Sequence, residues 1–108
     1  MSRERGNRAE DLACDWLMLQ GCRILERNVY SRFGEIDIVA EKGGVLHFVE
    51  VKSGTTFEPI YNITPSKLAK LLRSIDAYLK KHRLESPYQL DALIVKGERC
   101  EWIENITV

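Results

Sequence analysis

Residues 34–52 read GEIDIVAEKGGVLHFVEVK, two alternating runs of apolar and polar residues joined by a pair of glycines. Because successive side chains of a strand point to opposite faces, Asp37 shares a face with Glu35, and Glu50 shares a face with Lys52. The glycine pair is typical of a tight hairpin turn. The stretch therefore predicts carboxylates and one ammonium group converging on one patch of sheet, with an opposite apolar face made of Ile36, Ile38, Val49 and Val51.

This group of side chains has a definite chemistry. Carboxylate oxygens are preferred ligands of hard cations such as Mg²⁺, and a neighbouring lysine can orient a nucleophilic water or stabilise negative charge on a phosphate. The combination is typical of a metal-dependent phosphodiesterase. The alternative is a solvated sheet face, because antiparallel sheets commonly have one wet face. The spacing Asp-x₁₂-Glu-x-Lys is short and degenerate, so it does not decide between the two.

Length and composition predict one globular domain over residues 1–108, with 44% hydrophobic and 30% charged residues. No apolar run is long enough to cross a bilayer, and the basic N-terminus has no apolar stretch behind it. The three cysteines are odd in number and lack metal-ligand spacing, so we expect reduced thiols. These features predict a cytoplasmic protein with no membrane partner.

The net charge of the chain is zero at neutral pH. Most proteins that bind a phosphate backbone are basic overall, so a nucleic-acid-binding chain with this charge has to concentrate its positive residues on one surface. The composition itself neither supports nor excludes nucleic acid as a partner.

Hydrophobic periodicity and turn residues predict two helices and five strands. Asn7 is a candidate N-cap for the first helix, and Gly21 ends it. Either Thr64 or Ser66 begins the second helix, and Pro65 suits its first turn if Thr64 is the cap. The long helical crossover between the third and fourth strands predicts that these two strands run parallel. The expected elements are helix 7–20, strands 23–31, 35–41 and 45–53, a loop at 54–63, helix 64–82, and strands 88–95 and 100–107.

Two features of the helices bear on function. Glu10 lies at the margin of the apolar stripe of the first helix, so it either points toward the sheet or is a first-turn acid favoured by the helix dipole. The second helix carries a polar stripe separate from its apolar one, which either contacts phosphates or is a solvated face. This stripe consists of Lys67, Lys70, Ser74 and Lys81.

The element order, with Asp37 on the second strand and Glu50-x-Lys52 on the third, resembles the restriction-endonuclease-like (PD-(D/E)XK) nuclease fold. That fold is an α/β αβββαββ core in which helices flank a mixed sheet. The two motifs also resemble the signature of the YraN family of small bacterial proteins, and the likeness covers nearly the whole chain. Further matching positions are Glu10, Gly21, Asn28, Thr64, Lys67, Asp91 and Glu101-Trp102-Ile103. The family is linked to nucleases through its fold and its similarity to archaeal Holliday-junction resolvases.

The resemblance implies roles for individual residues. Asp37 and Glu50 would be ligands of Mg²⁺ or Mn²⁺, and Lys52 the catalytic lysine. Glu10 matches the first-helix acid that completes the metal site in the resolvase branch. The accessory positions implied are Glu10, Glu35 and Lys67, with no role assigned to Glu35.

The leading hypothesis is therefore a metal-dependent DNA endonuclease acting on branched or structured DNA, in which Lys67, Lys70 and Lys81 contact phosphates. By analogy with resolvases, we expect a homodimer. The rival hypothesis is a non-catalytic nucleic-acid-binding or adaptor protein that keeps the fold and serves a DNA-processing partner. The neutral net charge favours this rival, as do three positions where the family pattern is basic and this chain is not, namely Gly54, Pro65 and Gln89. A third hypothesis is a plain protein-interaction module with a metal-free acidic patch.

Overall fold

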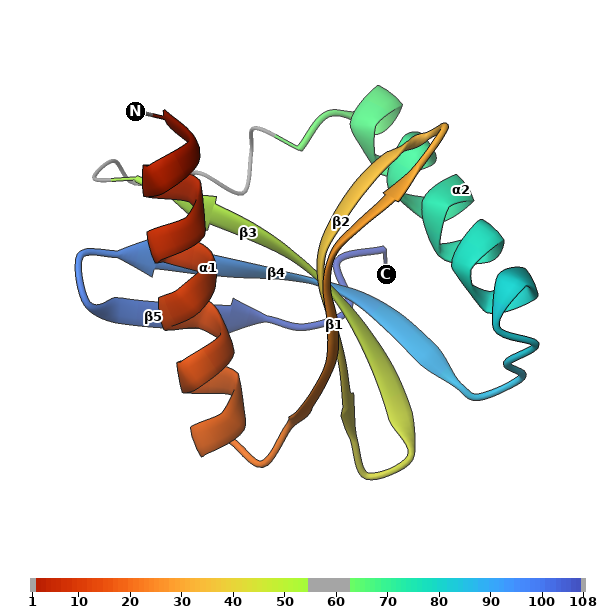
Figure 1. The fold of residues 1–108 in the computed structure, drawn as a ribbon, viewed down its shortest axis with the longest axis horizontal. Coiled ribbons are helices and arrows are strands. Elements are labelled where there is room, and N and C mark those ends of the chain that lie inside the picture. The colour runs from red at the N-terminus through yellow and green to blue at the C-terminus, as the bar shows by residue number, and fades with distance from the viewer. Residues whose placement is uncertain (1, 55–62, 108) are drawn as a thin grey trace.

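The computed structural model describes residues 2–54 and 63–107, with side chains from residue 8 onward (Figure 1). Its element order is the expected αβββαββ, which confirms the α/β class. The elements are α1 (Ser2–Leu19), β1 (Arg23–Ser31), β2 (Gly34–Lys42), β3 (Val45–Ser53), α2 (Pro65–Lys81), β4 (Tyr88–Lys96) and β5 (Arg99–Ile103).

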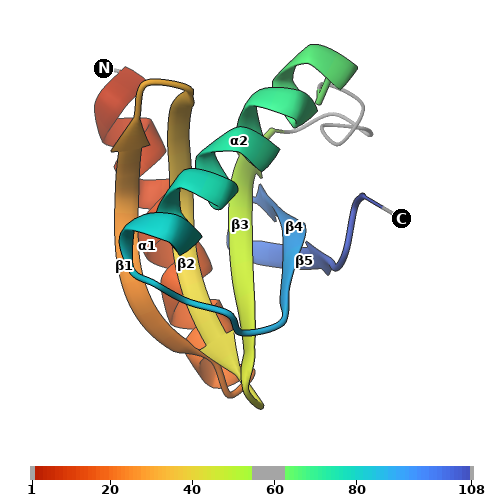
Figure 2. The same ribbon diagram turned by 90° about the vertical axis from the view of Figure 1, so that its right-hand side faces the viewer.

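The strands form one mixed sheet in the order β1-β2-β3-β4-β5. In this sheet β3 and β4 pair in parallel, as the helical crossover predicts, and the other neighbours are antiparallel. Helix α1 covers one face of this sheet and α2 covers the other, as Figure 2 shows. This arrangement is compatible with a restriction-endonuclease-like core. Among the described residues, no helix combines the length and hydropathy needed to cross a bilayer.

Helix α1 follows the predicted pattern except at its start. Ala9, Ala13 and Leu17 are buried at spacings of four residues, and Gly21, with φ of +95°, ends the helix as expected. The predicted N-cap at Asn7 is wrong, because the helix begins at Ser2 and Asn7 lies inside it. The preceding Arg-Glu-Arg run consists of good helix formers, which explains the longer helix.

Two predicted local signals are confirmed. Gly43 and Gly44 both have positive φ, of 60° and 83°, and close the β2–β3 hairpin. Thr64, not Ser66, caps α2, because its hydroxyl accepts a hydrogen bond from the Lys67 N–H at 3.1 Å and Pro65 is the first helical residue. The three cysteines are free thiols, as expected.

Two other predictions need correction. The last strand ends at Ile103 and not at 107, because Asn105, with φ of +56°, turns the chain. Ser74 is not part of an exposed polar stripe: it is buried, and its hydroxyl hydrogen-bonds with that of Ser31 at 3.1 Å. The predicted loop at 54–63 falls almost entirely on residues 55–62, which lie outside the described residues, so it stays a prediction.

The β2–β3 pairing stops before the ends of both strands, and this creates the site described next. The ladder joins residues 38–42 to 45–49, and beyond it the β1–β2 hairpin diverges from β3 (Figure 1). Ile38, Val49 and Val51 share one face, as predicted, and this face packs against α1. Ile36 does not, because after the strands diverge it packs in the cluster on the α2 side. On β2, the strict alternation of faces therefore ends where the ladder ends, whereas on β3 it continues to Val51 because β3 stays paired with β4.

Candidate active site

The predicted site residues lie where β2 and β3 diverge, between α1 and the beginning of α2. Asp37 comes from β2, and Glu50 and Lys52 come from β3. Short distances join them into two adjoining groups, which together include nearly all the residues singled out from the sequence. The first group is Glu10, Glu35 and Asp37, and the second is Glu50, Lys52 and Lys67.

Asp37 bridges the diverging strands. Its Oδ2 accepts a hydrogen bond from the Val51 N–H at 2.8 Å, a donor that no longer has a partner in the β2–β3 ladder. Burial raises the pKa of Asp37 from 3.8 to about 7, and repulsion from Glu50 adds to the effect. Without a cation, this carboxylate is therefore only partly ionised at neutral pH.

Glu10 points toward the sheet, which resolves the alternative left open by the sequence. Because α1 begins at Ser2, Glu10 lies in the third turn and is not a first-turn acid. Its side chain is 12% exposed, and Glu10, Glu35 and Asp37 each place a carboxylate oxygen within 4.8 Å of the others. Within the described part of the chain, the buried Oε1 of Glu10 has no hydrogen-bond partner.

Arg27 on β1 is a neighbour of this acid group that the sequence did not reveal. Its Nη2 lies 2.8 Å from Asp11 Oδ1 and 3.6 Å from Glu10 Oε1, which is beyond hydrogen-bond distance. The hydrogen bond to Asp11 raises the pKa of Arg27 and keeps the guanidinium near Glu10. The guanidinium does not hydrogen-bond with Glu10 itself. No local motif marks Arg27, because its position depends on how β1 and α1 pack together.

Glu50 turns toward the lysines. Its Oε1 lies 3.3 Å from Lys67 Nζ and 3.9 Å from Lys52 Nζ, while its buried Oε2 lacks a hydrogen-bond partner among the described residues. Of the three predicted metal ligands, Glu10 and Asp37 therefore lie in one ligand group, in which Glu35 takes the third place instead of Glu50.

This donor set fits a hard divalent cation. All the candidate ligand atoms are carboxylate oxygens, which suit Mg²⁺ or Mn²⁺ and not softer metals. Glu10 and Glu50 each carry a buried oxygen without a hydrogen-bond partner in the described structure. Such oxygens are costly to bury, and coordination of a cation would remove that cost.

The two lysines differ in how firmly they hold a proton. Burial lowers the pKa of Lys52, and a hydrogen bond from the Lys67 ammonium lowers it further. Burial also opposes the charge of Lys67, but its hydrogen bond with Lys52 and the adjacent Glu50 carboxylate raise its pKa above the ordinary value. Lys52 is therefore the member of the pair that loses a proton first.

The remaining predicted lysines of α2 lie at different distances from the site. Lys70 is one turn beyond Lys67 and lines the same hollow beside the site. Lys81 is at the other end of α2, about 21 Å from Lys67 at 1.5 Å per residue. The structure does not bring Lys81 to the carboxylates.

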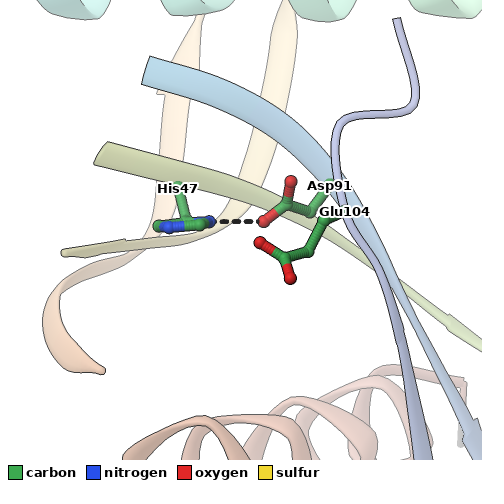
Figure 3. A group of neighbouring side chains, drawn as sticks. All are labelled: His47, Asp91 and Glu104. Atoms are coloured by element: carbon green, nitrogen blue, oxygen red, sulfur yellow. Dashed lines mark hydrogen bonds and ion pairs between the residues drawn. The ribbon is translucent and has the colours of Figure 1, made fainter. Parts of the chain in front are cut away.

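A second, separate cluster with possible ligand atoms is formed by His47, Asp91 and Glu104 (Figure 3). Asp91 is fully buried, and His47 Nδ1 donates to its Oδ2 at 2.7 Å. Three more donors reach it, namely Trp102 Nε1 at 3.0 Å on Oδ2, and Gln89 Nε2 and the Asn105 N–H, each at 2.8 Å, on Oδ1. Each oxygen already accepts two hydrogen bonds, so Asp91 serves as an anchor for the C-terminal segment, and we do not interpret the cluster as a metal site.

Comparison with known sequences identifies the family. The sequence profile of the uncharacterised protein family UPF0102 matches residues 9–95. The chain belongs to the UPF0102 family. This confirms the resemblance to the YraN proteins noted from the motifs.

Relatives of this UPF0102 chain match it over almost its full length. A UPF0102 protein of Helicobacter hepaticus is 58% identical over 107 residues, covering 99% of this chain and 97% of its own. A Wolinella succinogenes UPF0102 protein is 55% identical over 108 residues, with complete coverage of both chains. One from Helicobacter pylori is 54% identical over 105 residues, covering 97% and 92%. These names give the family and not an activity.

Proposed function

We propose that this UPF0102 protein is a Mg²⁺- or Mn²⁺-dependent nuclease that hydrolyses phosphodiester bonds in DNA. The observation that supports this proposal is that a group of three acids and a group of Glu50 with two lysines lie next to each other. The acids Glu10, Glu35 and Asp37 lie within reach of one ion, and a lysine pair meets Glu50 beside them.

The residues divide the chemistry between them. Asp37 and Glu10 would hold the cation, with Glu35 beside them and with the Oε2 of Glu50, which lacks a hydrogen-bond partner in the described structure. When bound, the cation would neutralise the scissile phosphate and lower the pKa of a coordinated water. Lys52, whose pKa burial lowers, accepts a proton from the attacking water. Lys67 keeps its proton and offsets the negative charge that develops on the phosphoryl oxygens.

The substrate class follows from where the positive charge lies. Although the whole chain is neutral, Lys67 and Lys70 line one hollow beside the site, and Arg32 and Arg73 line the next one along α2. Cations gathered on one surface are what a phosphate backbone requires. Branched or structured DNA and a dimeric assembly are the expectations that come from the resolvase resemblance.

One observation favours a second candidate, a non-catalytic adaptor that binds DNA and a DNA-processing partner. Glu50 already pairs with both lysines, so its charge is balanced without a cation. In this role, the lysines and carboxylates would form an internal network that positions α2, and cleavage would not occur.

The deciding experiment incubates the purified protein with linear, branched and single-stranded DNA, with and without Mn²⁺. Two variants are tested alongside the native protein. Asp37→Asn removes the proposed metal ligand, and Lys52→Ala removes the proposed proton acceptor. The nuclease predicts cleavage that requires Mn²⁺ and is lost in both variants. DNA binding without cleavage, unaffected by Mn²⁺, would instead favour the adaptor.

A further inference from the structure

A hollow of about 360 Å³ lies between the β1–β2 turn and the first turns of α2. We call it the α2 hollow. Phe33 and Leu71 give it an apolar part, and the Ser66 hydroxyl gives it a polar one. The charged residues that line the hollow are two lysines and one glutamate, namely Lys67, Lys70 and Glu35. Its volume is in the range that takes a small organic ligand.

One of the residues that line the hollow is aromatic. The Arg32 guanidinium lies over the Phe33 ring, 4.9 Å from its centroid, while the ring also lines the α2 hollow. An aromatic side chain of this kind offers a stacking surface that accepts any nucleobase, because every base has a π-face.

The α2 hollow is continuous with the candidate active site. Glu35 lines it and also belongs to the acid group with Glu10 and Asp37. Lys67 lines it and also contacts Glu50. A group bound in the hollow would therefore lie directly beside a phosphate held at the carboxylates.

We propose that the α2 hollow takes up one unpaired nucleotide of the DNA, next to the phosphate that is cut. This inference rests on the proposed nuclease function and adds the place where one nucleotide of the substrate binds. The base stacks on Phe33, and Lys67 and Lys70 hold its flanking phosphates. A base inside a duplex has to be unstacked and extruded before it can enter, whereas an unpaired base avoids that energy cost. The protein therefore prefers DNA with a bulge, a flap or a branch point.

The test compares two duplexes of the same sequence, one fully paired and one with a single extrahelical 2-aminopurine. Binding is measured with the full chain in Ca²⁺, which occupies carboxylate sites while hydrolysis is blocked. We expect tighter binding of the bulged duplex and a change in 2-aminopurine fluorescence on binding. Phe33→Ala should weaken binding of the bulged duplex by about tenfold and leave the paired duplex unchanged, because base–aromatic stacking is removed.

Two further variants are included, one in case Phe33→Ala does not fold and one as a control. Phe33→Leu retains most of the apolar bulk at the turn and removes only the aromatic face, so it should show the same selective loss if Phe33→Ala does not fold. Tyr30→Ala removes an aromatic side chain of the same hairpin that is 72% exposed and does not line the α2 hollow, so it should bind both duplexes normally.

The outcomes separate this inference from the proposed function. Equal affinity for both duplexes, or an equal loss for both in Phe33→Leu, overturns the α2 hollow as a nucleotide site. Mn²⁺-dependent cleavage that persists in that case leaves the nuclease function standing. A Phe33-dependent preference without any Mn²⁺-dependent cleavage supports the hollow and rejects the nuclease.

Discussion

The Asp37 carboxylate accepts a hydrogen bond from the Val51 N–H at 2.8 Å, across the point where β2 and β3 part. The same side chain belongs to the acid group with Glu10 and Glu35. One residue thus ties the two strands together and supplies a candidate ligand. Replacing it with the amide keeps an oxygen for Val51 and removes the charge, so structural and chemical roles can be separated.

Metal binding should depend on this charge. Excess Mn²⁺ should raise the melting temperature of the native protein by several degrees, because a ligand that binds only the folded state stabilises it. Asp37→Asn and Glu50→Gln should fold and show no shift, and both should be at least as stable as the native protein without metal. Lys52→Ala is the control and should keep the shift. A native melt that does not respond to Mn²⁺ would contradict a competent metal site.

The stability of the metal-free protein should vary with pH through Asp37. Its pKa is about 7 in the folded protein against an ordinary 3.8, so the folded state keeps a proton that the unfolded chain has released. This contribution is fully present below pH 3.8 and is lost as the pH rises through 7. Urea unfolding should therefore show the stability of the native protein falling relative to that of Asp37→Asn as the pH rises over that window. If the two plots of unfolding free energy against pH run parallel, the pH dependence comes from a residue other than Asp37.

Lys67 should act on cleavage through Lys52. Removing its ammonium raises the pKa of Lys52, because that ammonium is one cause of the lowering. In Lys67→Met, the acid limb of the pH–rate profile should move to higher pH, while Lys52→Ala should abolish cleavage at every pH. A Lys67→Met profile that loses amplitude without moving along the pH axis would indicate that Lys67 acts only on the substrate and has no effect on the pKa of Lys52.

DNA affinity should depend on the beginning of α2. The double variant Lys67→Ala/Lys70→Ala should bind any DNA sequence more weakly, because two ammonium groups no longer neutralise phosphates. The slope of log affinity against log salt should fall by about two, roughly one for each ammonium group removed. Lys81→Ala, at the far end of the helix, should have a much smaller effect. An equal effect of Lys81→Ala would extend the DNA surface along the whole of α2.

Asp91 should matter for stability and not for metal. It is fully buried and accepts four hydrogen bonds, so Asp91→Asn places an NH₂ donor against other donors. We expect a loss of about 2–4 kcal/mol in the free energy of unfolding, as for other disrupted buried polar networks. Chemical denaturation measures it, with the half-buried Gln89→Ala as a milder control. If Mn²⁺ restored the stability of Asp91→Asn, this would show instead that the His47, Asp91 and Glu104 cluster binds metal.

What the sequence could predict was mostly local. The period-two alternation predicted that Glu50 and Lys52 share a face, and they lie together because β3 stays paired with β4 as far as Ser53. Asp37 lies just beyond the β2–β3 ladder, and it groups with Glu10 and Glu35. The glycine turn and the Thr64 cap were likewise readable, because each depends on neighbouring residues only.

The predictions that were wrong, and the neighbours that the sequence did not reveal, depend on contacts between segments that are distant in the sequence. Ile36 changed faces because β2 leaves β3, and Ser74 is buried because it meets Ser31, 43 positions away. Arg27 beside Glu10 and the turn of Glu50 toward Lys67 likewise depend on how the helices pack on the sheet. Periodicity along one segment holds no information about such neighbours.

The candidate active site draws its side chains from α1, β2, β3 and α2, which span positions 10 to 67. No single hairpin or helix in the described part of the chain holds more than part of this candidate set. A nascent chain leaving the ribosome would therefore carry every acid before it carried Lys67, and none of them would be in register until the sheet and both helices had closed. The proposed hydrolytic activity therefore requires the finished tertiary structure, because an incomplete copy lacks the segment that supplies Lys67.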